Sequence, residues 1–185
     1  MNMIINRVKN LLFSPKAEWE KINSEDKTSV DIVKEYLIYL IAIPVIAQFL
    51  RHIMFGYFLK ERVGFFTALI MAIVTFILII IGMYIAAYII NALAPSFNAQ
   101  KDEMAAFKLV AYSYTASAVA SIFVIFPILS ILSLLGLYSV YLFYVGLPIL
   151  MQCPKEKVLA YTVVSFLVML GVYILIMLIS VVFLC

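Results

Sequence analysis

Charged residues are scarce in this sequence. Only 12% of its 185 residues are charged, 66% are hydrophobic, and the mean hydropathy is +1.15. Soluble domains are about 25% charged, so these values exclude a water-soluble globular protein and a disordered tail. The 13 lysines and arginines form no dense basic run, and we therefore expect no nucleic-acid partner. The composition predicts an integral membrane protein with several spans.

Residues that build catalytic and metal sites are also few. The chain has one histidine, His52, and two distant cysteines, Cys153 and Cys185, which form no C-x-x-C motif. It has no G-x-S-x-G motif and no glycine-rich phosphate loop, and no acidic residue falls inside a predicted span. We therefore expect two free thiols, no metal, no other cofactor and no enzymatic activity. The same absence argues against a proton-coupled transporter that uses a buried acid.

The apolar segments predict an all-α protein with five transmembrane helices. The stretch from Ala105 to Met151 would make a helix about 70 Å long, more than twice the hydrocarbon core of a bilayer. It must therefore fold into two spans, with a turn at about 126–130 near Pro127. Pro44 is expected to kink the first span. The predicted spans are about 36–55, 65–93, 105–126, 130–151 and 159–184, within a membrane domain over 31–185.

Residues 1–30 are expected to form short cytoplasmic or interfacial helices. An apolar stripe at helical spacing predicts an amphipathic first helix, which either lies in the membrane interface or packs on the inner ends of the spans. Ser14 and Pro15 suit the cap and first turn of a second helix. We expect Trp19, the single tryptophan, to be an interfacial anchor, with a partner contact as the alternative. Ser29 is expected to cap the first span.

The distribution of basic residues predicts the orientation. With a cytoplasmic N-terminus, ten lysines and arginines lie inside and three lie outside, namely Arg51, Lys60 and Arg62. The positive-inside rule therefore favours an N-terminus in the cytoplasm and a C-terminus outside. We expect a multi-pass protein of the cell membrane, either the inner or the plasma membrane.

Small residues in the third span predict a helix-packing seam. Ser113, Ser117 and Ser121 recur every four residues, a spacing that allows helix backbones to approach closely. Measured from Ala105 and Met151 at about 1.5 Å per residue, Ser117 lies about 18 Å deep and Tyr138 about 20 Å deep. We therefore expect the Tyr138 hydroxyl to bond into the seam near Ser117, because a phenolic group at that depth needs a partner.

Two polar residues of the first span suggest a second kind of site. Gln48 lies near mid-depth, and Arg51 and His52 follow toward the outer end. Arg51 is expected to extend to the outer headgroups, with anionic lipid binding as the alternative. Gln48 and Arg51 are candidates for a polar groove, in which Gln48 would be joined by Ser113, Ser117 and Tyr138.

Three segments resemble a known family. They are RVKNLLFSPKAEWEKI, KLVAYSYTASAV and LLGLYSVYLFYVGLPILMQCPKEKVLAYTVV. They are similar to the Yip family of Ypt/Rab-interacting membrane proteins, in its short prokaryote-like form. The resemblance is strongest at Gly136-Leu137-Tyr138, Tyr141, Gly146-Leu147-Pro148 and the loop from Pro154 to Tyr161. We add Tyr141, Gly146 and Pro148 to the candidate helix-packing seam. Ala116 stands where the family often has a proline, which removes the reason to expect a kink in the third span.

The resemblance implies five spans, a cytoplasmic N-terminus and a role as a membrane scaffold or adaptor. The expected partners are membrane lipid and either other membrane proteins or further copies of the chain. Eukaryotic relatives bind prenylated Rab-type GTPases and carry a longer cytoplasmic N-terminal region. This chain has only about 35 residues there, so we do not expect GTPase binding. The alternative function is transport or scrambling of a small molecule or lipid through the polar groove.

Overall fold

The computed structural model describes residues 2–55 and 64–182, and these residues form helices joined by short connections, without a strand. Five of the helical segments are long and apolar enough to cross a membrane, as predicted: Ser29–Phe55, Phe65–Phe97, Glu103–Ile125, Pro127–Leu150 and Lys155–Ile179. The predicted end of the last span at residue 184, Cys185, and the loop residues Lys60 and Arg62 lie outside the described residues.

The N-terminal region forms two short helices before the first span. They are α1 (Asn2–Phe13) and α2 (Pro15–Ser24), and proline occupies the first turn of α2 as predicted. The first span begins with α3 (Ser29–Ile32), but Ser29 is not its cap. Thr28 is the N-cap: its hydroxyl oxygen accepts the Asp31 backbone N–H, and the Asp31 side chain accepts the Thr28 N–H in return. This reciprocal capping box satisfies two backbone donors.

The rest of the first span contains one irregular turn. The π-helical turn η1 (Val33–Leu37) connects α3 to α4 (Ile38–Phe55), and Pro44 lies inside α4. The second span is the long helix α5 (Phe65–Leu93), which ends in the 3₁₀ turn η2 (Ala94–Phe97). Asn98 then adopts a left-handed conformation with φ 54°, which asparagine tolerates better than most residues.

The third and fourth spans are an antiparallel pair that changes helix type along its length. The third comprises α6 (Glu103–Ser113), α7 (Thr115–Ala120) and the 3₁₀ helix η3 (Ser121–Ile125). Extended backbone at Phe126, followed by Pro127, makes the turn at the predicted position. The fourth span comprises the 3₁₀ helix η4 (Pro127–Leu137) and α8 (Tyr138–Leu150), and α9 (Lys155–Val182) forms the last.

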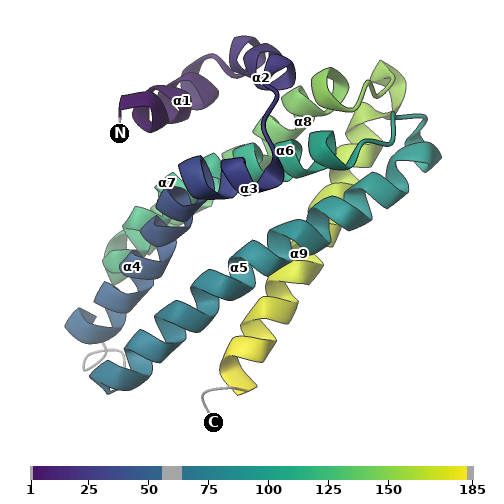
Figure 1. Cartoon of the computed structure of the whole chain (residues 1–185). Helices are drawn as coiled ribbons and strands as arrows, with labels where there is room; N and C mark the ends of the chain where they lie inside the picture. The colour runs from purple at the N-terminus through teal and green to yellow at the C-terminus, as the bar shows by residue number, and fades with distance from the viewer. Residues whose placement is uncertain (1, 56–63, 183–185) are drawn as a thin grey trace.

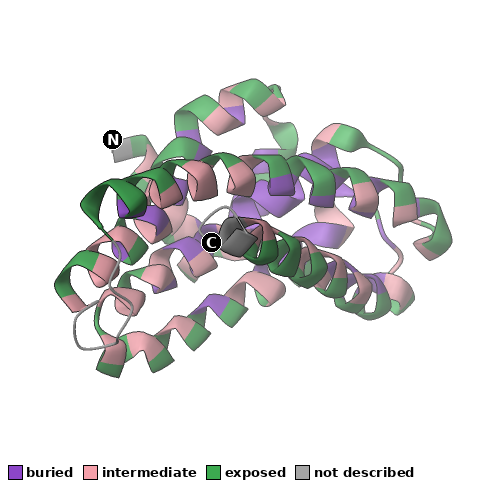
Figure 2. Ribbon diagram, turned by 90° about the horizontal axis from the view of Figure 1, so that it is seen from below, coloured by how far each residue is buried: buried purple, intermediate pink, exposed green. Residues whose placement is uncertain are grey.

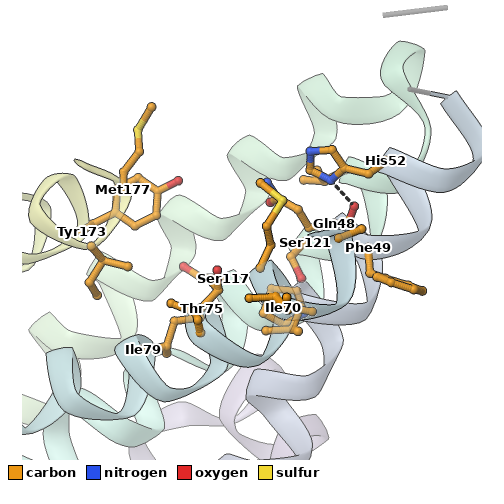
Figure 3. A pocket seen from close by; sticks show the side chains of 18 of the residues that line it. Gln48, Phe49, His52, Ile70, Thr75, Ile79, Ser117, Ser121, Tyr173 and Met177 are labelled. Carbon is orange, nitrogen blue, oxygen red and sulfur yellow. Dashed lines mark hydrogen bonds between the residues drawn. The ribbon is translucent and has the colours of Figure 1, made fainter. Parts of the chain in front are cut away.

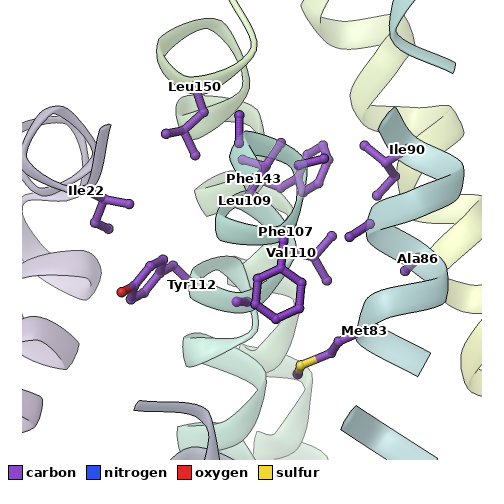
Figure 4. Close-up of a cluster of buried hydrophobic side chains, with 14 of the residues drawn as sticks. Ile22, Met83, Ala86, Ile90, Phe107, Leu109, Val110, Tyr112, Phe143 and Leu150 are labelled. Carbon is purple, nitrogen blue, oxygen red and sulfur yellow. The ribbon is translucent and has the colours of Figure 1, made fainter. Parts of the chain in front are cut away.

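The core surrounds α6. In Figure 1, α1 and α2 lie together over α6 and α8, while α4, α5 and α9 extend away from them. Figure 4 shows apolar side chains from α2, α5, α6 and α8 meeting around Leu109 and Val110. In the apolar stretch of the third span 56% of the residues are buried, whereas 22% or fewer are buried in those of the other four spans. The third span is therefore the central element, and Figure 2 shows exposed residues along the outer faces of the other helices.

Candidate functional site

A buried lysine fastens the N-terminal helices to the third span. Lys108 on α6 is the only charged residue between Ala105 and Met151, and it is buried. Its Nζ donates to the carbonyl oxygens of Ile22, at 3.1 Å, and Glu25, at 2.6 Å. These carbonyls belong to the C-terminal end of α2, where helix carbonyls lack partners and a cation is favourable. Lys108, a residue of α6, therefore binds the carbonyl oxygens at the C-terminal end of α2.

A network of ion pairs joins α1 to α2 beside this lysine. Arg7 on α1 hydrogen-bonds to Glu25 and forms an ion pair of 3.1 Å with Glu18, whose carboxylate is buried. The Asn10 amide also donates to Glu18, at 2.9 Å. Burial alone would lower the pKa of Arg7, but the hydrogen bond and charge of Glu25 raise this pKa above its usual value. The buried carboxylate is thus both paired and hydrogen-bonded, as a buried charge requires.

Three aromatic rings extend the network into the spans. Tyr112 on α6 lies at the centre: the Arg7 guanidinium carbon is 5.5 Å from its ring centroid, and the Trp19 and Tyr36 rings are 6.3 Å and 4.8 Å away. The Tyr36 hydroxyl shares a 2.7 Å hydrogen bond with Thr115 on α7. A cation over an aromatic face is attractive, so the arrangement couples α1 and α2 to the first and third spans.

Trp19 is not an interfacial anchor, and that prediction is wrong. Its side chain has 0% exposure, so its ring cannot contact lipid headgroups. The indole N–H donates to the Leu142 carbonyl oxygen at 3.0 Å, and the ring lies directly over Gly146 of α8. Apolar burial and one satisfied polar group hold it there. Trp19 therefore anchors α2 to α8 inside the protein.

The serine seam contacts the fourth span through Ser139, the residue that follows Tyr138. The Ser117 hydroxyl donates to the Gly136 carbonyl oxygen at 3.0 Å, and the Ser117 backbone N–H donates to the Ser139 hydroxyl at 3.0 Å. The expected bond between Tyr138 and the seam is wrong: the Tyr138 hydroxyl donates to the Leu12 carbonyl oxygen of α1 at 3.0 Å. Successive helical residues point about 100° apart, so Ser139 faces the third span while Tyr138 faces α1.

The other candidate seam residues lie in different surroundings. Ser113 is buried and its hydroxyl has no hydrogen-bond partner within the described ranges, whereas the Ser121 hydroxyl donates to the Ala118 carbonyl oxygen at 2.6 Å. Tyr141 is exposed, and its ring lies 5.1 Å from that of Tyr138. Pro148 lies half-buried inside α8. Of the three serines, Ser117 makes the hydrogen bonds that join the third and fourth spans.

A cavity of about 510 Å³ lies between α4, α5, α9 and the C-terminal half of the third span. Figure 3 shows Gln48 and His52 at one end of it and Tyr173 and Met177 on the opposite wall. Ser117 and Ser121 also line the cavity, whereas Ser113, Tyr138 and Arg51 do not. The structure thus brings Gln48 and Ser117 together, as the groove hypothesis requires, and leaves the other residues of that hypothesis elsewhere.

The sequence reasoning missed the residues that hold the N-terminal helices. Lys108 had a usable signal, because it is the lone charge in a long apolar stretch, and such a charge needs a buried partner. No sequence signal identifies Arg7, Glu18 and Tyr112. The contacts between these residues depend on how α1 and α2 fold back onto α6. Among the described residues, no three histidine, cysteine, aspartate or glutamate side chains gather into a metal site.

Comparison with known proteins identifies a family that matches this chain. A family model described as the Yip1 domain matches residues 9–179, nearly the whole chain. No curated protein and no solved structure matches the chain. The matched range includes Arg51, Lys108, Ser117 and Tyr138, together with α2 and all five candidate spans.

Proposed function

The chain belongs to the Yip1 domain family, and from this premise we propose that it is a membrane scaffold or adaptor that acts by association. The family consists of non-enzymatic membrane proteins, which supports a role without catalysis. The observation that carries the proposal is the docking of α1 and α2 on α6 and α8 through Lys108 and Trp19. Helices held this firmly present a constant outer surface, and a constant surface suits recognition because little ordering entropy is lost on binding.

The proposed contact surface is the outer face of α2. Lys16, Glu20 and Lys21 are exposed there, opposite the face formed by the buried residues Glu18, Trp19 and Ile22. Both charge signs are present, which suits a protein partner more than a purely anionic surface. The partner is another membrane protein or a further copy of this chain.

The proposed orientation places these helices in the cytoplasm. Ten of the 13 basic residues then lie on the inner side, which the positive-inside rule favours. The exposed residues Met3, Ile5 and Phe13 of α1 are proposed to rest in the inner interface of the cell membrane. Reporter fusions at the two termini test this: the reporters should report opposite faces, and two reporters on one face would contradict the proposal.

Crosslinking in native membranes tests the association. A lysine-reactive crosslinker is added to intact membranes, the tagged chain is purified in denaturant, and crosslinked peptides are identified by mass spectrometry. We expect crosslinks from Lys16 or Lys21 to one membrane protein, which disappear in a Glu20→Arg variant that keeps both lysines. Lys101→Glu is the control, because Lys101 is exposed in a loop at the inner ends of the spans. Equal crosslinking in both variants, or none in the wild type, would argue against an adaptor.

A second candidate function is movement of a small molecule or lipid along the helices. The specific observation in its favour is the cavity that joins Gln48 to Ser117. Reconstituted chain should then accelerate the flip of a fluorescent phospholipid in liposomes, and Gln48→Leu should reduce the rate. A rate equal to that of protein-free liposomes would dismiss this candidate and leave the adaptor proposal untouched.

A further inference from the structure

The cavity lined by Gln48 and Ser117 is open to its surroundings, and these surroundings are lipid. α4, α5 and α9 each belong to a candidate membrane span, and α7 and η3 belong to the third. Gln48, Tyr173 and Met177 are exposed even though they line the cavity. A molecule that enters from this side therefore comes from the hydrocarbon region or its edge.

One end of the cavity carries polar groups that the protein leaves available. The Gln48 side-chain amide makes no hydrogen bond within the part of the chain that the structure describes. His52 Nδ1 donates to the Gln48 backbone carbonyl oxygen at 2.8 Å, which leaves Nε2 for another partner (Figure 3). An amide inside a bilayer needs a hydrogen-bond partner because hydrocarbon offers none. The occupant must therefore supply a neutral acceptor near Gln48.

Most of the other lining residues are apolar, the exceptions being Thr75, Tyr114, Ser117, Ser121 and Tyr173, and no lysine, arginine, aspartate or glutamate lines the cavity. Ile79, Ile176 and Met177 form its far part, between α5 and α9. A charged substrate would lose its hydration here without compensation. An ester carbonyl joined to a long alkyl chain fits both parts of the cavity. The carbonyl oxygen accepts a hydrogen bond from the Gln48 amide, and the alkyl chain fills the apolar part.

The cavity volume of about 510 Å³ falls within the range of sites for small ligands.

We propose that this cavity binds one membrane glycerophospholipid. One acyl chain lies between α5 and α9, and its ester carbonyl accepts a hydrogen bond from the Gln48 amide. The headgroup lies beyond His52, at the end of α4. The site requires neither the adaptor function nor lipid movement, because binding without release into the other leaflet is enough.

Photolabelling tests the site directly. The chain is reconstituted into phosphatidylcholine vesicles that contain a small fraction of phosphatidylcholine with a diazirine in one acyl chain. After illumination, labelled peptides are quantified by mass spectrometry. We expect several-fold more label on the cavity side of α9, around Tyr173 and Met177, than on the exposed residues Ile73, Ile77 and Ile81 of α5. Excess unlabelled lipid should dilute the outer label more than the cavity label, because a bound lipid exchanges slowly.

Two variants and a matched control complete the test. Thr75→Phe fills the cavity and should reduce the cavity label at least fivefold, and Gln48→Leu should make that label as easily diluted as the outer label. Ile77→Phe adds the same ring to the outer face of α5. It should change neither the amount of cavity label nor the dilution of that label by unlabelled lipid. Trp19 fluorescence verifies folding in each variant. Equal labelling of cavity and outer face in the wild type, an equal effect of Thr75→Phe and Ile77→Phe, or crosslinks to a second copy at the cavity would overturn the proposal.

Discussion

The indole of Trp19 lies so close to Gly146 that a Cβ atom built on the glycine would be 2.6 Å from Trp19 Cε2. The same atom would lie 2.8 Å from Leu109 Cδ1. Real Cβ atoms do not approach this closely, so an alanine at this position would push α2 away from α8. The absence of a side chain at Gly146 is thus what allows the N-terminal helices to dock.

Gly146→Ala is therefore predicted to loosen α2. Overpacking costs about 1–3 kcal/mol, which outweighs the gain of about 1 kcal/mol from replacing glycine inside a helix. Because Trp19 is the only tryptophan, its emission should shift to the red and become accessible to acrylamide. Gly171→Ala is the matched control, since a Cβ atom there meets nothing within 4 Å. Identical emission from the two variants would show that the contact does not hold α2.

Lys108→Met is predicted to free the C-terminal end of α2 while preserving the bulk of the side chain. The change removes two charge-assisted hydrogen bonds, each worth about 1.5–3 kcal/mol, and leaves the carbonyls of Ile22 and Glu25 without this donor. Amide hydrogen exchange over residues 20–28 should become at least tenfold faster. Lys101→Met, at an exposed position, should leave this exchange unchanged. Unaltered exchange in Lys108→Met would mean that the buried lysine does not stabilise the C-terminal end of α2.

The membrane spans were predictable because their signal is local. About 20 consecutive apolar residues are needed to cross a bilayer, and the length of the stretch from Ala105 to Met151 required a turn that Pro127 marked correctly. The first span begins at Ser29, earlier than the predicted start near residue 36, because the Thr28 capping box carries the helix through its polar residues.

The contacts between helices were predictable only in part. The depth calculation identified the level at which Ser117 meets the fourth span, but a depth contains no information on rotation. It therefore selected Tyr138 where Ser139 makes the bond. The Trp19 prediction failed for a related reason. A tryptophan in a short helix beside a membrane suits a headgroup position, and nothing in the local sequence shows that α2 folds onto Gly146.

Ser117→Leu and Tyr138→Phe are predicted to separate two structural roles. A Cβ on Gly136 would already lie 3.2 Å from Ser117 Cα, so a leucine at Ser117 cannot fit, and the midpoint of thermal unfolding should fall by several degrees. Tyr138→Phe loses one hydrogen bond, worth about 0.5–1.5 kcal/mol, and should loosen α1 only. Hydrogen exchange should therefore rise across η4 and α7 in the first variant and near Leu12 in the second. An increase near Ser117 in Tyr138→Phe would restore the original pairing hypothesis.

Cys153 is predicted to react slowly with thiol reagents, in a manner that depends on pH. The side chain is buried beside η2, and burial raises the pKa of its thiol above the usual value because desolvation disfavours the thiolate. At a given pH the reactive thiolate is therefore less populated than in an exposed cysteine, and the rate of alkylation should rise through a midpoint at higher pH. The rate is measured with N-ethylmaleimide in a Cys185→Ser background. The reference is Lys155→Cys, an exposed position at the start of α9, with both native cysteines replaced by serine. Equal midpoints for the two thiols would show that the loop is open and that Cys153 is not desolvated.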